Sequence, residues 1–134
     1  MDQGDTHIED HADDPIDEVA RYNIARWDAL VAANALFTRP AVNLDAASAR
    51  QMLDPENRLG ALTGKRVLCL ACGGGQQSIA FALLGAQTTV FDLSAAQLQR
   101  DAEAAARYGV DIKIAQGDMR DLSAFADDTF DIVY

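Results

Sequence analysis

The chain has 134 residues, of which 49% are hydrophobic and 24% charged, and these values fit one domain with a single core and leave no room for two. A formal net charge of −10 repels phosphate backbones and argues against nucleic acid as a partner. Two cysteines imply no disulfide framework, and the apolar runs fall short of a membrane helix, so we predict a cytoplasmic protein with no membrane partner.

The first residues are acidic and contain almost nothing apolar, so we predict a disordered tail over residues 1–13. His7 and His11 lie four residues apart in this tail. On a helix that spacing could hold a metal ion, but two ligands in a flexible acidic segment rarely form a site. We therefore predict no metal site.

A helix is predicted to start at Asp14, which can serve as the N-cap, with Pro15 in the first helical position and Asp17 in the first turn. It should end near Phe37, before Pro40. Apolar residues at helical spacing predict one buried face: Ile16, Val19, Ala20, Trp27, Leu30, Val31 and Ala35.

A second, shorter helix is predicted from Asp45 to Leu53, followed by a connector from Glu56 to Gly64. The next stretch organises the rest of the chain. Residues 67–71 are all apolar, which is typical of a central strand of a parallel sheet that is buried on both faces. Three glycines at 73–75 then lead into a predicted helix from Gln76 to Leu84, which Gly85 ends.

The following segment repeats this alternation of strand and helix. A strand is predicted from Thr88 to Phe91, followed by Asp92 at its carboxyl end. Ser94 and Gln97 form a capping-box pattern that opens a helix to about Tyr108. Its predicted buried stripe consists of Leu98, Ala102, Ala105 and Ala106.

A third strand is predicted where Val110, Ile112 and Ile114 alternate with polar residues, as at a sheet edge. Gly117 and Asp118 end this strand. Residues 119–129 read as a loop or short helix with Leu122 and Phe125 turned inward. Residues 130–134 begin a fourth apolar strand at which the sequence stops, so we expect the N-terminal part of a longer protein.

Three features thus follow three successive strands: the glycines, Asp92 and Asp118. Ligands of open α/β sheets bind at the carboxyl ends of the strands, where glycines allow close approach to the main chain. Asp92 lies 92 − 73 = 19 residues after Gly73, near the offset of about 20 at which an acid reaches a ribose. A second acid beside the same crevice suits an adenine amino group. The sequence therefore predicts a nucleoside-cofactor site.

Four segments, at residues 67–75, 90–94, 117–122 and 130–133, together resemble the class I S-adenosylmethionine-dependent methyltransferases, and most closely those with a methyltransferase-11-like domain. The resemblance implies an α/β, Rossmann-like three-layer sandwich with a mainly parallel sheet, in strand order 3-2-1-4-5-7-6. Residues 64–134 would form the first half of that domain, and residues 14–63 a helical lid and connector. The fourth strand would then be an exposed apolar edge, which favours aggregation and marginal stability.

The resemblance also implies roles for single residues toward S-adenosylmethionine. Ala71, Gly73 and Gly75 would pass main chain against the methionine part. Asp92 would bind the ribose hydroxyls. Around these we expect the remaining cofactor contacts from Tyr22, Cys72, Gln76, Gln77, Leu93, Gln97, Gly117, Asp118 and Met119.

Two positions depart from the family pattern: Cys69 stands where an acid is usual, and Ala71 where a glycine is usual. The methionine amino group would need another partner, such as Gln76 or Gln77. The C-x-x-C pair could suggest redox chemistry, but Cys69 lies within a buried strand, so core packing for Cys69 and a loop beside the cofactor for Cys72 are favoured.

We expect methyl transfer to a small-molecule acceptor, with no catalytic residue assigned. A nicotinamide-dependent oxidoreductase is the main alternative, although the third glycine of G-x-G-x-x-G would fall at Ser78. The third possibility is a binding module that keeps the fold without catalysis. The sequence leaves the oligomeric state open.

Overall fold

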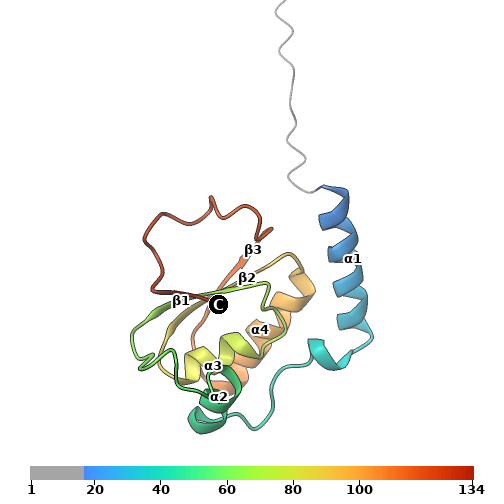
Figure 1. Ribbon diagram of the computed structural model, residues 1–134. Coiled ribbons are helices and arrows are strands. Elements are labelled where there is room, and N and C mark those ends of the chain that lie inside the picture. The colour runs from blue at the N-terminus through green and yellow to red at the C-terminus, as the bar shows by residue number, and fades with distance from the viewer. Residues whose placement is uncertain (1–16) are drawn as a thin grey trace, which may run out of the picture.

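The computed structural model describes residues 17–134 (Figure 1). Its helices are α1 (Glu18–Ala32), α2 (Ala46–Leu53), α3 (Gln77–Leu83) and α4 (Ala95–Tyr108), with one 3-10 turn, η1 (Leu36–Thr38). Its strands are β1 (Arg66–Leu70), β2 (Gln87–Asp92), β3 (Lys113–Gln116) and β4 (Ile132–Val133). The predicted tail, with His7 and His11, and the predicted helix start at Asp14 and Pro15 lie outside the described residues.

The four strands form one parallel sheet in the order β3-β2-β1-β4. Val67 of β1 is in register with Thr88 of β2 on one side and with Ile132 of β4 on the other. Val67, Leu68 and Cys69 are all buried, which confirms that β1 is the central strand covered on both faces. The predicted edge positions of β3 and β4 are confirmed as well.

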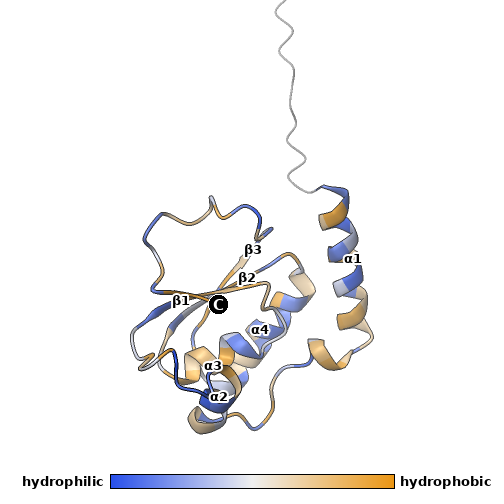
Figure 2. Cartoon of the chain, viewed as in Figure 1, coloured by the Kyte–Doolittle hydropathy of each residue, from blue (hydrophilic) through white to orange (hydrophobic). Residues whose placement is uncertain are grey.

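Helices α2, α3 and α4 cover one face of this sheet (Figure 1). The core between them joins Val67 and Cys69 of β1 and Val90 of β2 to Ala80 and Phe81 of α3, and all five side chains are fully buried. Figure 2 shows α3 in hydrophobic colours, while α2 and α4 present hydrophilic residues on their outer sides. The Rossmann-like α/β class is therefore confirmed, and this core fixes the carboxyl ends of the strands.

The opposite face of the sheet meets the segment between β3 and β4. Phe125 packs edge-on against Phe91 of β2, with ring centroids 5.2 Å apart, and against Phe130 at 5.4 Å. The third layer here is a helix-free loop. Phe125 is turned inward as predicted, but Leu122 is 38% exposed, so its predicted inward orientation is wrong.

Helix α1 stands beside α4 and away from the sheet (Figure 1). It ends at Ala32, five residues before the predicted end at Phe37, because Asn34 takes a left-handed φ of 52° and η1 follows. Its predicted buried face is confirmed only in part, since Val19 is 60% exposed and Trp27 39% exposed. Ala20 is buried, Leu30, Val31 and Ala35 are half-buried, and Ile16 lies outside the described residues. A helix that packs on the side of another helix, with no sheet beneath it, buries only a narrow stripe.

The buried stripe of α4 also differs from the prediction. Ala105 and Leu98 are buried as expected, but Ala102 and Ala106 are exposed. Gln97 and Asp101 take the buried positions instead, which a count of apolar residues cannot detect. Within residues 17–134, no helix is both long and apolar enough to cross a membrane.

Candidate cofactor site

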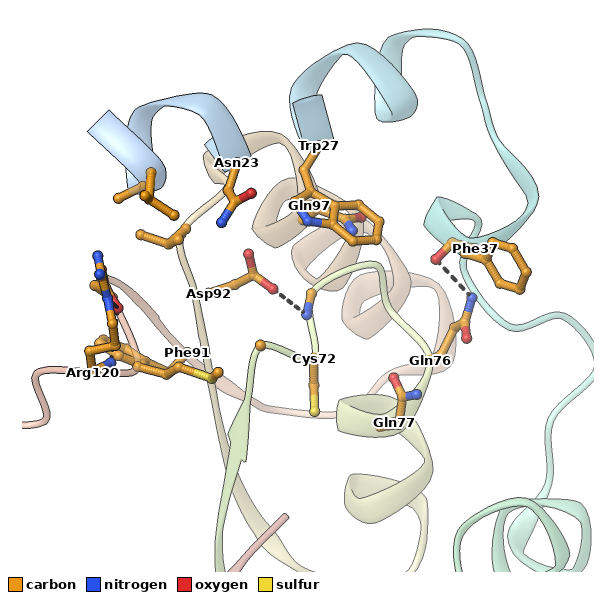
Figure 3. Close-up of a pocket in the computed structure, with 18 residues that line it drawn as sticks. Asn23, Trp27, Phe37, Cys72, Gln76, Gln77, Phe91, Asp92, Gln97 and Arg120 are labelled. Atoms are coloured by element: carbon orange, nitrogen blue, oxygen red, sulfur yellow. Dashed lines mark hydrogen bonds and ion pairs between the residues drawn. The ribbon is translucent and has the colours of Figure 1, made fainter. Parts of the chain in front are cut away.

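A cavity of about 430 Å³ opens at the carboxyl ends of β1, β2 and β3 (Figure 3). Such a volume lies in the range of small-molecule sites. It is lined by α1 and η1 on one side and by the strand ends on the other. The predicted site residues that line it are Ala71, Cys72, Gly73, Gln76, Gln77, Asp92, Leu93, Gln97, Gly117, Asp118 and Met119.

The glycine turn after β1 brings main chain up to this cavity. Gly74 and Gly75 have φ values of 118° and 79°, which L side chains rarely adopt. A Cβ on Gly73 would lie 2.6 Å from Gln97 Cβ and 2.9 Å from Asp92 Oδ2. The turn is therefore tight on steric grounds, and only glycine fits at its centre.

Asp92 ties the end of β2 to this turn. Its Oδ2 accepts a hydrogen bond from the Gly73 N–H at 2.9 Å, and its Oδ1 accepts from the Ser94 N–H at 2.9 Å. A carboxylate oxygen can accept two bonds, so each oxygen keeps capacity for a ligand donor. Asp92 is thus held in place by main chain and still faces the cavity that it lines.

Asp101 of α4 holds the same turn from behind, and sequence reasoning missed it. Its carboxylate accepts hydrogen bonds from the Gly74 N–H at 2.9 Å, the Gly75 N–H at 3.1 Å and the Ser78 hydroxyl. Burial raises the pKa of Asp101 to about 6, although these three donors act in the opposite direction. The missed signal was an acid four residues after Gln97 in an alanine-rich helix.

Asp118 follows β3 and forms an ion pair with Arg120. The Arg120 Nε lies 2.9 Å from Asp118 Oδ2 and 3.0 Å from Oδ1, and the Arg120 N–H donates to Oδ1 at 2.9 Å. Arg120 also reaches Asp17 at the start of α1, with Nη1 2.9 Å from Asp17 Oδ2. These contacts lower the pKa values of Asp17 and Asp118. Sequence reasoning had left out Arg120.

Two residues predicted to contact the cofactor do not line the cavity. Tyr22 is 70% exposed and lies outside the cavity, while its neighbour Asn23 lines it. Gly75 is buried behind the turn, where a Cβ would lie 2.8 Å from the Arg100 carbonyl oxygen, so it supports the turn and does not face the cavity. Tyr22 was predicted without knowledge of how α1 is rotated about its axis.

Residues 18–38, which are expected to act as a lid and are called the lid segment below, border the other side of the cavity. Asn23 and Trp27 reach from α1 toward the opening bordered by Asp92, and Phe37 of η1 lies beside Gln76 (Figure 3). The Gln76 Nε2 donates to the Arg39 carbonyl at 2.8 Å. Gln76 therefore connects the chain after η1 to the turn, whereas Gln77 lines the cavity.

The cysteines take the places that were expected. Cys69 is fully buried in β1, and Cys72 lines the cavity with its Sγ 3.1 Å from the Leu70 carbonyl oxygen. A hydrogen bond with Cys72, together with burial, raises the pKa of the Cys69 thiol. Cys69 is therefore a core residue and an unreactive thiol.

The cavity combines apolar walls with a few fixed polar groups. Trp27, Phe37, Phe91, Leu93 and Met119 supply the apolar surface, while Asp92 and Asp118 supply carboxylates. No cluster of three potential metal ligands occurs among residues 17–134. The arrangement can bind and orient a flat, partly polar ligand, and the polar groups suit one with hydroxyl and amino donors.

Comparison with known proteins shows the family to which the chain belongs. A family model described as "Methyltransferase domain" matches residues 67–134, half of the chain. The chain is 44% identical over 79 residues to the protein named uncharacterized methyltransferase YbaJ of Bacillus subtilis (strain 168), which covers 59% of this chain and 31% of that protein. The chain thus spans about a third of the length of the curated relative.

Solved structures share the fold. The PH0226 protein of Pyrococcus horikoshii OT3 is 29% identical, with a TM-score of 0.59 over 75% of this chain and 47% of that one. An S-adenosylmethionine-dependent methyltransferase of Thiobacillus denitrificans, solved with S-adenosyl-L-homocysteine, is 22% identical, with a TM-score of 0.54 over 78% and 41% of the two chains. The matched family model is general, so the narrower methyltransferase-11-like type stays a prediction. The chain belongs to the methyltransferase-domain family and has the fold of the class I S-adenosylmethionine-dependent methyltransferases.

Proposed function

We propose that this domain binds S-adenosylmethionine in the cavity beside Asp92 and serves methyl transfer to a small-molecule acceptor. The family assignment supports a methyltransferase, and the geometry of the glycine turn supports the cofactor. In this proposal residues 14–63 are the lid and connector, and residues 64–134 are the first half of the cofactor-binding domain.

The observation that carries the proposal is that the N–H groups of the glycine turn already donate to carboxylates of the protein. The Gly73 N–H donates to Asp92, and the Gly74 and Gly75 N–H groups donate to Asp101. Dinucleotide-binding turns keep such N–H groups free for a pyrophosphate. Here two carboxylates already accept them and add negative charge, so this turn disfavours an anion and favours a cation such as a sulfonium or an ammonium group.

The same geometry weakens the nicotinamide alternative at a second point. The third glycine of the dinucleotide motif would let the helix pack close to the strand. Ser78 stands there, is fully buried and donates its hydroxyl to Asp101. Ser78 thus helps Asp101 to hold the turn in place, and this arrangement needs no bound phosphate.

The proposed residue roles follow from position. Asp92, with its spare acceptor capacity, binds the ribose hydroxyls. Leu93 lies against the adenine, whose edge meets Asp118 and the Met119 main chain. Ala71 and Gly73 pass along the methionine part, and Gln77 is the side chain available for its amino group.

The cofactor, when bound, supplies the activated methyl group, which an acceptor takes in an in-line displacement. The protein aligns the two partners and excludes water. Trp27 of the lid segment serves this exclusion, since its ring lines the cavity with apolar surface. We assign no catalytic base among the described residues.

A small-molecule acceptor fits the charge of the chain. A net charge of −10 disfavours nucleic acid, and we keep a cytoplasmic location as part of the proposal. A cofactor-binding module without catalysis is the remaining alternative, because the chain spans only part of its relatives.

The proposal is tested by measuring transfer of a radiolabelled methyl group from S-adenosylmethionine in the protein as it is naturally encoded. The acceptors offered are a panel of small molecules, a tRNA pool and a protein pool. We expect the wild-type protein to transfer label to a small molecule and the Asp92→Asn variant to lose this transfer. Asp111→Asn, which removes the same charge from the exposed surface, is the control and should keep it. Label in RNA or protein would overturn the acceptor class. Cofactor binding without transfer to any pool would favour the non-catalytic module.

A further inference from the structure

Arg120 joins two parts of the molecule that lie more than one hundred residues apart in the sequence. Its guanidinium contacts Asp118, which follows β3, and Asp17, the N-cap of α1. Both Asp118 and Arg120 line the cavity, as do Val19 and Ala20 in the first turn of α1. The contact therefore crosses the mouth of the proposed cofactor site.

Arg120 binds each of the two carboxylates through more than one donor. Toward Asp17, the Arg120 Nη1 lies 2.9 Å from Oδ2 and Nη2 lies 3.0 Å from Oδ1, which is a two-pronged arrangement. Toward Asp118, Nε and Nη2 both donate, and the Arg120 main-chain N–H adds a third donor. One arginine thus satisfies two carboxylates through its planar fork, which a lysine could not reproduce.

The N-terminal end of α1 contributes one buried side chain near the cavity mouth. Ala20 is the buried residue of the helix, and Val19 is 60% exposed. Further along the helix, Ser94 donates to Asp28 and Arg100 donates to the Val31 carbonyl. Near the cavity mouth, the burial of Ala20 and the contact between Arg120 and Asp17 thus both help to hold α1 in position.

Arg120 also occupies acceptor positions on Asp118. A carboxylate offers about four acceptor sites. Oδ1 of Asp118 already accepts from the Arg120 N–H and Nε, and Oδ2 accepts from Nε and Nη2. A ligand amino group at Asp118 must then exchange with part of the arginine fork.

We propose that Arg120 is a positioning residue that holds the N-terminal end of α1 across the cavity mouth and yields acceptor positions on Asp118 when the cofactor enters. This proposal rests on the proposed function for the identity of the ligand. The part that concerns α1 does not need a ligand, which allows the two to be tested separately.

The ligand-free test measures the exposure of α1. Trp27 is the one tryptophan of the chain, lies on α1 and is 39% exposed, so acrylamide quenching of its fluorescence reports opening of the lid segment. Hydrogen exchange of the amides of residues 21–24 reports the same end of the helix. The variants are Arg120→Gln and Asp17→Asn, because asparagine remains a good N-cap after the charge is removed.

We expect both variants to increase quenching and to speed exchange by about two- to fivefold, as for the loss of an exposed ion pair. Arg107→Gln, in the exposed last turn of α4, is the matched control and should change neither. Raising the salt concentration from 0.05 to 1 M should act on the wild type in the same direction and leave Arg120→Gln nearly unchanged. Exchange and quenching that stay at wild-type values in both variants would overturn the positioning role.

The ligand test measures the kinetics of S-adenosyl-L-homocysteine by stopped flow, again with Trp27 as the probe. We expect association and dissociation both to accelerate about two- to fivefold in Arg120→Gln, because the mouth opens and Asp118 is released. An unchanged association rate would overturn the exchange at Asp118. Absence of binding to the wild type would contradict the proposed function, while the ligand-free measurements would still decide the role of Arg120 at α1.

Discussion

The glycine turn and the lid segment border the same cavity but are built in opposite ways. The turn is fixed by buried groups: Asp101 is fully buried and binds two glycine N–H groups, and Gly75 packs against the main chain of α4. The lid segment is held by exposed contacts such as that between Arg120 and Asp17, and it leaves Val19, Tyr22 and Phe37 largely exposed.

This difference assigns different tasks to the two sides. A turn whose N–H groups are already paired needs little rearrangement on binding, so it can determine which ligand fits. A helix held by exposed ion pairs, which solvent screens and which contribute little to stability, can move at low cost. Selectivity should therefore lie with the turn, and access with the lid segment.

The largest effect is expected from Gly75→Ala. The residue has a φ of 79°, and its Cβ would lie 2.8 Å from the Arg100 carbonyl oxygen. We expect urea denaturation to show a loss of about 3 kcal/mol or more in the free energy of unfolding. Gly109→Ala is the control, since it has a φ of 66° and open space around it, and should cost about 1 kcal/mol. Equal losses would show that the turn is not packed as described.

Asp101→Asn should have the next largest effect. An amide cannot accept from both glycine N–H groups and the Ser78 hydroxyl as a carboxylate does, so a buried donor is left unpaired. We expect a loss of about 2 kcal/mol in the free energy of unfolding at pH 7. Ser78→Ala removes one of the three donors and should cost less. A neutral effect of Asp101→Asn would break the contrast between the two regions.

The pH dependence of stability gives a second test of the role of Asp101. Because burial raises the pKa of Asp101 to about 6 in the folded chain, its contribution to stability is fully present below about pH 4 and is lost as the pH rises through 6. The difference in unfolding free energy between wild type and Asp101→Asn should therefore fall by about 1–3 kcal/mol from pH 4 to pH 7. A difference that rises over this range would contradict the raised pKa.

The smallest effects are expected in the lid segment. Tyr22→Ala should change the free energy of unfolding by about 0.5 kcal/mol or less, because the side chain is 70% exposed, and should leave cofactor affinity unchanged. Trp27→Ala, in the same helix, removes an aromatic wall of the cavity and should weaken binding of S-adenosyl-L-homocysteine about three- to tenfold. Calorimetric titration of both variants checks this. An equal loss of affinity in the Tyr22→Ala and Trp27→Ala variants would show that Tyr22 does contact the ligand.

Much of the sheet was predictable from the sequence. The buried run at 67–71, the glycines and the apolar residues of β2 carry strong local signals, and the observed order β3-β2-β1-β4 agrees with the one implied by the resemblance. The buried face of α1 was not predictable, since apolar residues at helical spacing do not say whether a sheet or only another helix lies opposite. The same limit explains why Ala102 and Ala106 were placed wrongly.

The residues of the candidate site also fall into a predictable group and an unpredictable one. Residues that follow strands, such as Asp92 and Asp118, were found because strand ends converge at one edge of a parallel sheet. Asp101 binds Gly74 of the turn, and Arg120 binds Asp17 at the start of α1, so both residues act through contacts between segments that are distant in the sequence. Such contacts leave no spacing signal. For Asp101, the available indication was a polar residue on the buried stripe of α4.

Selectivity of the glycine turn for a sulfonium nucleoside is tested most directly by calorimetric titration of the wild-type chain with S-adenosyl-L-homocysteine, NAD and inorganic pyrophosphate. We expect S-adenosyl-L-homocysteine to bind one molecule per chain, and NAD and pyrophosphate to give no binding, because Asp92 and Asp101 already accept the glycine N–H groups. Binding of NAD or pyrophosphate without binding of S-adenosyl-L-homocysteine would contradict it.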